Sequence, residues 1–215
     1  MSIAVVDYGM GNLRSVAKAL QHVAADQPVF ITSDAEEIHR AERVVFPGQG
    51  AARDCMRELH ARNLHTVVMQ AAREKPFLGI CMGMQVLADH SEENAGVECL
   101  GLYPGNVRFF GNPLCDVQGV TLKVPHMGWN QVQQTAHPLW HNIANNSRFY
   151  FVHSYYMDPQ DQSLIMGTTT HGKKFVSAMG RNNVFAVQFH PEKSASDGLQ
   201  LLKNFSRWQG TDKVT

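Results

Sequence analysis

The sequence predicts a three-layer α/β fold, in which an open, mostly parallel sheet with flanking helices is extended by an antiparallel or mixed section. Two observations support this. Residues 1–96 alternate short apolar runs with stretches whose apolar residues recur at helical spacing. Beyond residue 96, β-branched and aromatic runs follow one another with turns between them. The 215 residues, 44% of them hydrophobic, are enough to bury one core, so we expect a single domain over residues 1–215.

The first part of the chain contains four units, each a short apolar run followed by a helix-like stretch. In the first unit Leu13, Val16 and Leu20 lie on one helix face, and Asn12 is placed to cap that helix. Strands joined by crossover helices run parallel, so these units predict a parallel sheet. The expected strands and helices are 3–9 and 12–24, 28–32 and 34–41, 43–48 and 51–73, and 76–80 and 82–90.

The rest of the chain is predicted to form strands and one final helix. Strand-like runs occupy 107–111, 122–133, 147–157, 164–180 and 183–191, with hairpin turns expected at 170–174 and 180–183. Residues 196–209 predict an amphipathic helix, which Ser196 or Asp197 is expected to cap. The apolar face that should dock on the core consists of Leu199, Leu202, Phe205 and Trp208.

The composition argues against several classes of partner. Nineteen Lys and Arg balance nineteen Asp and Glu, so the chain has no overall field to attract nucleic acid or an anionic membrane. The N-terminal segment lacks the basic flank and the length of a signal peptide or a membrane span, which predicts a cytoplasmic protein. The histidines show no H-E-x-x-H spacing and the four cysteines form no C-x-x-C pair, so no metal site is expected.

Residues 76–90 place one cysteine at the boundary between an expected strand and an expected helix. Gly79, Cys81 and Gly83 reproduce the spacing of a G-x-S-x-G turn, in which the nucleophile is strained and its neighbours must be small. At a helix start the dipole favours a thiolate, and backbone amides from Met82 onward are able to bind an oxyanion. The alternative reading of this stretch is a buried cysteine that acts only as a small apolar residue.

A thiolate nucleophile needs a base, and residues 184–194 supply a candidate. Residues two apart on an extended segment point the same way, so His190 and Glu192 present an imidazole and a carboxylate side by side. The carboxylate would orient the ring and stabilise its protonated form. In the alternative reading the two side chains pair in water on a surface turn, which contributes little.

Two glycine-containing turns need separate interpretations. Residues 7–12, DYGMGN, do not fit a dinucleotide-binding turn, because Arg14 stands where that motif requires its third glycine. Residues 47–50, PGQG, follow the third expected strand and should end at the same sheet edge as Cys81. Open α/β sheets bind their ligands at that edge.

The GICMGMQ stretch and the distal FHPE motif resemble those of the class I, or triad, glutamine amidotransferase family. Cys81, His190 and Glu192 match its catalytic triad in order. The resemblance implies hydrolysis of the side-chain amide of L-glutamine through a cysteinyl thioester, with no metal or organic cofactor. The ammonia released would pass to a partner active site.

The same resemblance assigns an oxyanion strand and a substrate site. The oxyanion strand would be Gly48, Gln49 and Gly50, although the family more often has a small aliphatic residue at position 49. Free glutamine also carries a zwitterionic head group that a pocket must bind. The residues expected to bind the substrate are Gln85 by its amide, Glu93 at the ammonium group, and, by resemblance, Ser154 and Tyr155 at the carboxylate.

Three further stretches, 5–16, 124–132 and 149–156, resemble one branch of this family, which serves a (β/α)8 barrel cyclase in histidine biosynthesis. A heterodimer with such a cyclase is therefore expected. The large side chains of these stretches would be core residues in the alternative reading. The residues expected to face the partner are Asn12, Met127, Trp129, Tyr150 and Lys193.

Other functions stay open from the sequence. The chain could be the glutaminase of another synthase, such as those for anthranilate, pyridoxal phosphate or guanylate. It could also be a stand-alone cysteine hydrolase of γ-glutamyl compounds, or a non-catalytic module that keeps the fold. Glutamine turnover with and without a cyclase partner discriminates among these functions.

Overall fold

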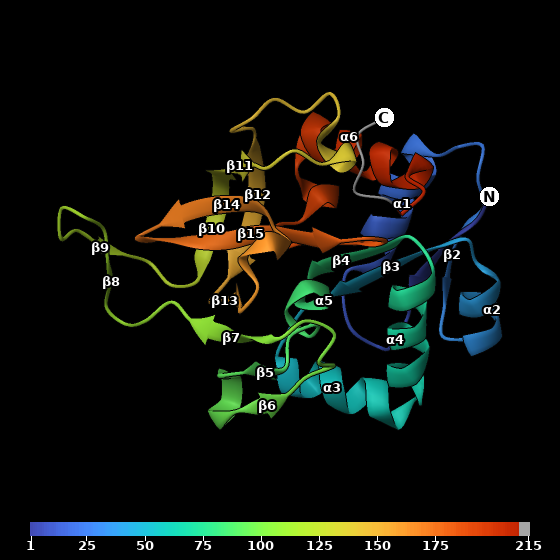
Figure 1. Cartoon of the computed structure of the whole chain (residues 1–215), viewed down its shortest axis with the longest axis horizontal. Helices are drawn as coiled ribbons and strands as arrows, with labels where there is room; N and C mark the ends of the chain where they lie inside the picture. Colours follow the sequence, from blue (N-terminus) through green and yellow to red (C-terminus); the bar gives the residue numbers. More distant parts are fainter. Residues whose placement is uncertain (211–215) are drawn as a thin grey trace.

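The computed structural model describes residues 1–210 and shows a large sheet with helices on both faces (Figure 1). Residues 211–215, the end of the range expected to form one domain, lie outside the described residues. The α-helices are α1 (Leu13–Val23), α2 (Ala35–Arg40), α3 (Ala52–Ala61), α4 (Leu64–Glu74), α5 (Met82–Gln85) and α6 (Ala195–Arg207). The short 3₁₀ helices are η1 (Glu93–Ala95), η2 (Pro138–Trp140), η3 (Gln162–Leu164) and η4 (Pro191–Lys193). The strands are β1 (Ile3–Val6), β2 (Val29–Thr32), β3 (Arg43–Gly48), β4 (Phe77–Cys81), β5 (His90–Ser91), β6 (Val97–Glu98), β7 (Gly105–Phe109), β8 (Leu114–Cys115), β9 (Thr121–Leu122), β10 (His126–Gln131), β11 (Gln133–Gln134), β12 (Arg148–His153), β13 (Tyr155–Pro159), β14 (Ile165–His171), β15 (Lys173–Arg181) and β16 (Val184–Val187).

The main sheet has a parallel half and an antiparallel half, which confirms the predicted fold class. Its order is β2-β1-β3-β4-β16-β15-β13-β7-β5-β6, with β14 beside β15 and β11 beside β14. The strands from β2 to β16 in this order pair in parallel, whereas β15 pairs antiparallel with β16, β13 and β14. One core cluster lies between the sheet and α1 and α6, and the other lies between the sheet and α2, α3 and α4.

The C-terminal strands do not all join the main sheet as expected, because β8–β9 and β10–β12 form separate two-stranded sheets. The run at 122–133 contains β10, which pairs with β12 in a separate two-stranded sheet rather than joining the main one. Alternate residues of β12 point into the core, and its remaining side chains lie on the opposite side with half-buried or exposed surface. Both expected hairpin turns are present, with Gly172 at φ +69° between β14 and β15 and Asn182 at φ +56° between β15 and β16.

Several helix boundaries differ from the sequence pattern. The expected helix 82–90 ends after one turn, because Leu87 and Ala88 donate to carbonyls only three residues back and the chain then leaves the axis. The stretch 51–73 divides into α3 and α4 at Asn63, which adopts a left-handed conformation. Asn12 precedes α1 without a side-chain capping bond.

The predicted cap of the last helix is also wrong. Helix α6 begins at Ala195, so Ser196 and Asp197 lie inside its first turn and Ser194 holds the cap position without a side-chain capping bond. Its buried face includes Leu202 and Phe205 as expected.

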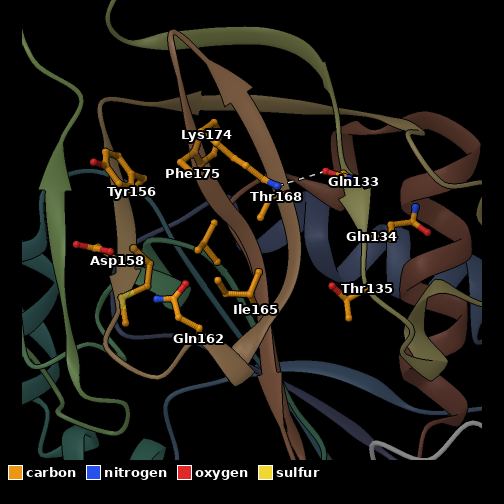
Figure 2. Close-up of a pocket in the computed structure, with 12 residues that line it drawn as sticks. Gln133, Gln134, Thr135, Tyr156, Asp158, Gln162, Ile165, Thr168, Lys174 and Phe175 are labelled. Atoms are coloured by element: carbon orange, nitrogen blue, oxygen red, sulfur yellow. Dashed lines mark hydrogen bonds between the residues drawn. The ribbon is translucent and has the colours of Figure 1, made fainter.

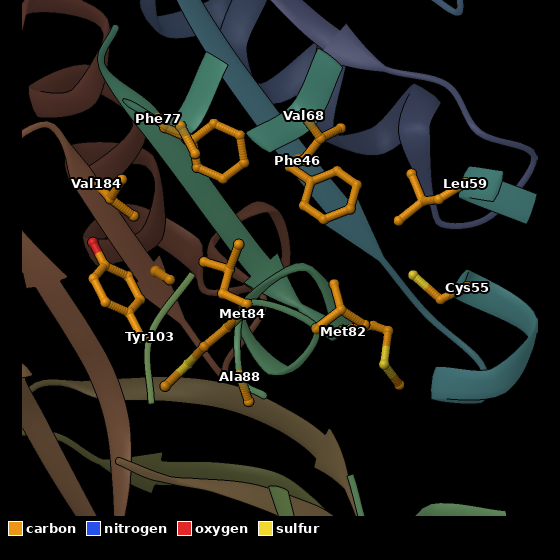
Figure 3. Packing of buried hydrophobic residues seen from close by; sticks show 14 of the residues in the cluster. Phe46, Cys55, Leu59, Val68, Phe77, Met82, Met84, Ala88, Tyr103 and Val184 are labelled. Carbon is orange, nitrogen blue, oxygen red and sulfur yellow. The ribbon is translucent and has the colours of Figure 1, made fainter. Parts of the chain in front are cut away.

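The backbone of α5 approaches the end of β3 very closely. A Cβ built on Gly83 would lie 1.9 Å from the carbonyl oxygen of Phe46, so only glycine fits there. Met82 and Met84, on either side, pack into the apolar cluster that contains Phe46 and Phe77 (Figure 3). The flanking methionines therefore anchor the one-turn helix while Gly83 lets it approach the strand.

This contact predicts a large stability loss for Gly83→Ala. The added methyl group must displace backbone, so we expect the free energy of unfolding to fall by about 3 kcal/mol or more. Gly119→Ala is the control, because Gly119 has positive φ but open space around it, and should cost only about 1 kcal/mol. Urea denaturation of both variants measures the difference. Equal losses of stability in the two variants would contradict the close approach of Gly83 to the Phe46 carbonyl.

Candidate active site

Cys81 is the last residue of β4 and has a backbone conformation that is rare for a residue with a side chain. Its φ is +56° and its ψ is −110°, and it pairs with Gly48 across the parallel β3–β4 ladder. A Cβ on Gly79 would lie 2.7 Å from the carbonyl oxygen of Gly83, so the glycines on either side of Cys81 are sterically required. Such strain, of order 1–3 kcal/mol, is typical of functional turns.

His190 follows the neighbouring strand β16 and is held by hydrogen bonds of its side chain and of its backbone. Its Nδ1 lies 2.9 Å from Oε1 of Glu192, whose side chain is 1% exposed. The backbone amide of His190 donates to the Tyr150 carbonyl at 2.9 Å, and its carbonyl accepts from the Ser194 hydroxyl at 2.6 Å. Because β16 pairs in parallel with β4, the imidazole emerges at the same sheet edge as Cys81.

The protonation state of His190 is set by two opposed effects. Burial lowers the pKa of His190. Hydrogen bonds to Cys81 and Glu192, together with the charges of both groups, raise it by more than burial lowers it, so the pKa rises from 6.5 to about 10. Nδ1 is taken by Glu192, and Nε2 has no hydrogen bond of good geometry within residues 1–210. Nε2 is therefore the nitrogen available to exchange a proton at the sulfur.

A cavity of about 460 Å³ opens beside Cys81 and His190. It brings together most of the predicted site, from strands that are far apart in the sequence. Glu192 lies behind His190, and Gly48 is buried in β3, so neither lines the cavity. The residues that line it are Gln49, Gly50, Cys81, Met82, Gln85, Glu93, Pro125, Val152, His153, Ser154, Tyr155, His190 and Lys193.

The two side chains expected to bind glutamine are already partly engaged. The Gln85 amide nitrogen donates to the Tyr155 carbonyl at 3.0 Å and to Oε1 of Gln188 at 2.9 Å, which leaves Gln85 Oε1 without a partner within residues 1–210. Oε2 of Glu93 accepts from the Ala52 amide at 2.7 Å, at the start of α3. Glu93 is thus fixed at the cavity wall by a helix terminus.

Sequence reasoning missed four residues of this site. Pro125, Val152 and His153 line the cavity, and Gln188, a fully buried amide, donates to the Cys81 sulfur at 3.7 Å. A signal existed for Gln188, because a glutamine within the apolar run VFAVQF is unusual. The other three lie in the stretches 124–132 and 149–156, which indicated the family branch but not a place in the cavity.

An exposed group of side chains borders the mouth of the cavity, and we name Met127, Trp129, Tyr150 and Lys193 the aromatic patch. Met127 is 63% exposed and Trp129 45% exposed, although both are large and apolar. Trp129 packs edge-on against Tyr150 at 6.2 Å, and the Lys193 ammonium lies 5.9 Å from the centre of the same ring. Lys193 also lines the cavity, so patch and cavity are continuous.

The fifth expected interface residue, Asn12, lies outside this patch. It follows Gly11, where an added Cβ would be 3.6 Å from the Cα of Gly48. The turn 9–12 therefore packs beside the segment 48–50 expected to bind the oxyanion.

A second hollow of about 540 Å³ lies on the antiparallel part of the sheet (Figure 2). Most of its side chains come from β11, β13, β14 and β15, with Thr135 after β11 and Gln162 in η3, and Lys174 reaches Gln133 at 3.4 Å. Among the residues that line it there is no cysteine, serine or histidine. It therefore lacks a nucleophile and base of the kind that the Cys81 cavity holds.

Two findings concern the described chain as a whole. Within residues 1–210, no cluster of three or more His, Cys, Asp or Glu could hold a metal ion. Over the same residues, no helix combines the length and apolar character needed to cross a membrane.

The comparison with family models decides the family. The model described as glutamine amidotransferase class-I matches residues 4–207. The chain belongs to the class I glutamine amidotransferase family.

Curated relatives within this amidotransferase family cover nearly the whole chain. A protein of Dechloromonas aromatica is 59% identical over 209 residues, 97% of either chain, and one of Hydrogenovibrio crunogenus is 57% identical over 211 residues, 97% of either chain. Both are named imidazole glycerol phosphate synthase subunit HisH.

Solved amidotransferase structures share the fold at low identity. A structure described as a glutamine amidotransferase superposes with a TM-score of 0.70 at 14% identity, over 95% of this chain and 97% of that one. The glutaminase domain of Trypanosoma brucei CTPS superposes with a TM-score of 0.61 at 18% identity, over 100% of this chain and 98% of that one.

The raised pKa of His190 predicts its titration. In the folded chain we expect the imidazole to lose its proton near pH 10, and in Cys81→Ala at a lower pH, because the bond and charge from the sulfur are gone. The folded pKa exceeds the unfolded value of 6.5, so the associated stability is complete below pH 6.5 and is lost as the pH rises to about 10.

Two measurements check this. Imidazole nitrogen NMR follows the titration directly. The free energy of unfolding of wild type minus that of His190→Gln should be largest below pH 6.5 and shrink toward pH 10. His141→Gln, at an exposed position, provides the control. Titration of His190 near 6.5 in the wild type would refute the assignment.

Proposed function

We propose that this chain is the glutaminase subunit of imidazole glycerol phosphate synthase and works in the cytoplasm. It hydrolyses L-glutamine to L-glutamate and ammonia. The ammonia passes to a (β/α)8 barrel cyclase, which makes imidazole glycerol phosphate and aminoimidazole carboxamide ribotide in histidine biosynthesis. The observation that carries the chemistry is the strained Cys81 beside the His190–Glu192 pair, hydrogen-bonded at 2.9 Å, at one cavity. The choice of synthase is supported by relatives up to 59% identical with that name.

The first half-reaction forms the thioester. The Cys81 thiolate attacks the side-chain amide carbon of glutamine, and the carbonyl electrons move onto oxygen. Backbone amides of Met82 and of segment 48–50 receive that negative charge. His190, protonated at neutral pH, gives its Nε2 proton to the leaving nitrogen, so ammonia departs as the carbon–nitrogen bond breaks.

The second half-reaction returns the enzyme to its starting state. Neutral His190 now takes a proton from water, whose oxygen attacks the thioester carbon. The carbon–sulfur bond breaks, glutamate leaves, and the sulfur again faces a protonated imidazole. Glu192 keeps the ring in one orientation throughout.

The substrate head group lies toward the wall opposite the triad. Gln85 offers its unpaired Oε1, and Glu93 offers a carboxylate to the ammonium group. Ser154 and Tyr155 border the same cavity and bind the carboxylate of glutamine through their backbone. The 460 Å³ available is ample for one amino acid.

The cyclase binds to the aromatic patch and to the turn that contains Asn12. An exposed Trp packed on a half-buried Tyr beside a lysine is typical of the anchors at protein interfaces. Because Lys193 belongs to both patch and cavity, a partner bound there lies next to the site where ammonia is released.

Turnover assays of the complex test the catalytic assignment. Wild-type chain with its cyclase and the cyclase's ribonucleotide ligand should hydrolyse glutamine, and Cys81→Ala in the same complex should lose at least about a thousandfold in rate. Cys115→Ala, at an exposed cysteine, should keep the wild-type rate. Full activity of the isolated chain, with no stimulation by the cyclase, would instead identify a stand-alone hydrolase.

Binding measurements test the partner surface. Trp129→Ala should weaken the complex about thirtyfold or more, as expected for an interfacial anchor. Ile31→Ala removes a comparably exposed apolar side chain from the β2 edge and should leave the dissociation constant unchanged. Isothermal titration calorimetry gives both values. Equal affinities of wild type and Trp129→Ala would exclude this surface.

A further inference from the structure

A line of polar groups runs from strand β10 through the interior to the sulfur of Cys81. Three of its members, His126, His153 and Gln188, have no part in the reaction steps above, and all three are buried. Burying polar groups is costly unless they are hydrogen-bonded, and in this line each one has a partner. In each hydrogen bond of the line, the chemical nature of the two groups shows which atom donates and which accepts.

The first half of the line has a single consistent arrangement of protons. The Tyr155 carbonyl can only accept, so Nδ1 of His153, 2.7 Å away, carries a proton. His153 Nε2 then accepts from Nδ1 of His126 at 2.9 Å. Nε2 of His126 accepts from the Asn130 amide nitrogen at 3.1 Å, which also donates to the Thr170 carbonyl at 2.9 Å. Both histidines are therefore neutral Nδ1–H tautomers.

Their surroundings keep both rings neutral. Burial lowers the pKa of His126 to about 4, assisted by the neighbouring His171, which stacks on it at 4.2 Å. Burial also lowers the pKa of His153, to about 3, although its bond to the Tyr155 carbonyl acts in the opposite direction. The line therefore carries no charge at physiological pH.

The second half runs from the same carbonyl to the nucleophile. Tyr155 accepts a second bond from the Gln85 amide nitrogen at 3.0 Å, and the other proton of that nitrogen goes to Oε1 of Gln188 at 2.9 Å. Because the side-chain oxygen of Gln188 accepts this bond, its amide nitrogen points to the sulfur of Cys81, 3.7 Å away. An N–H donor is thus held against the sulfur from behind, since Gln188 does not line the cavity.

We propose that Gln188 is a positioning residue for the Cys81 thiolate, and that its orientation is set by Gln85, which the Tyr155 carbonyl orients in turn. The inference rests on the proposed function only in taking Cys81 as the nucleophile. A charged sulfur accepts hydrogen bonds more strongly than a thiol. The fixed Gln188 amide donor therefore stabilises the thiolate and holds the sulfur in one position. Strand β10 also carries Met127 and Trp129. The strand that bears part of the aromatic patch is therefore connected to the Cys81 sulfur by a continuous series of hydrogen bonds.

Alkylation of Cys81 tests the role of Gln188 without glutamine. In the complex with the cyclase, Gln188→Met removes the donor at similar volume, and we expect iodoacetamide to modify Cys81 about 10- to 100-fold more slowly. Peptide mass spectrometry separates Cys81 from the exposed Cys115. The kcat for glutamine should fall together with the alkylation rate.

Ser177→Ala is the matched control. Ser177 is fully buried on β15, its carbonyl accepts the amide of Gln188, and its hydroxyl has no partner within residues 1–210. It should keep the wild-type alkylation rate. Equal rates in wild type and Gln188→Met, or an equal fall in Ser177→Ala, would overturn the positioning role.

Imidazole nitrogen NMR tests the direction of the chain in the wild-type complex, and so does not depend on whether Gln188→Met folds. We expect protonated Nδ1 and bare Nε2 on both His126 and His153. Asn130→Asp replaces the donor by an acceptor and should place a proton on Nε2 of His126. Asn145→Asp is the control, because there the side-chain oxygen accepts from Gln134 and is retained. A proton on Nε2 of either wild-type histidine overturns the arrangement.

These outcomes separate the two proposals. A wild-type complex that fails to hydrolyse glutamine, yet shows slower alkylation in Gln188→Met, rejects the proposed function and keeps the positioning role. Active wild type with alkylation unaffected by Gln188→Met does the reverse.

Discussion

The active site depends on one steric constraint, the close approach of α5 to the end of β3. Gly83 lies so near the Phe46 carbonyl that no side chain fits, and this approach holds Cys81 at φ +56° at the end of β4. The strain is small against the burial of Met82 and Met84 on both sides of that glycine. The hydrophobic core therefore supplies the free energy that keeps the sulfur exposed to the cavity in a single geometry.

The parallel pairing of β16 with β4 is a second constraint on the active site. His190 and Glu192 are separated from Cys81 by more than a hundred residues, yet the parallel register brings their strand ends together. Burial alone would make His190 a neutral base, but the sulfur and the carboxylate reverse its pKa shift. An imidazole that is protonated at rest suits a reaction whose first proton transfer is a donation to the leaving nitrogen.

The polar interior around this pair links binding, chemistry and the surface. Gln85 lies at the centre, because its amide nitrogen joins the Tyr155 carbonyl to Gln188 while its oxygen has no partner within residues 1–210. Glu93 similarly joins the cavity wall to the start of α3. Residues expected only to touch glutamine therefore also fix the architecture around it, so their substitution is expected to alter more than substrate affinity.

Much of the fold and of the triad was predictable from the sequence. The alternation of apolar runs and helical patterns predicts the parallel strands, and G-x-C-x-G followed by F-H-P-E predicts the reactive turn and its base. Helix lengths and caps were less predictable, as the one-turn α5 and the misplaced cap of α6 demonstrate, because tertiary contacts decide where helices end. The separate β10–β12 ladder was also missed, since strand pairing depends on contacts far apart in the sequence.

Local chemistry is therefore what the sequence by itself predicted: a candidate nucleophile, a histidine–carboxylate pair to serve it, and the glycines that the turn requires. Only the tertiary structure decided the rest of the site. The stretches that contain Gln188, His153 and His126 do not show what these side chains contact, because the folded chain alone brings their donors and acceptors within 2.7 to 3.7 Å. A buried hydrogen bond is a property of two groups and their separation, so one sequence position cannot reveal it.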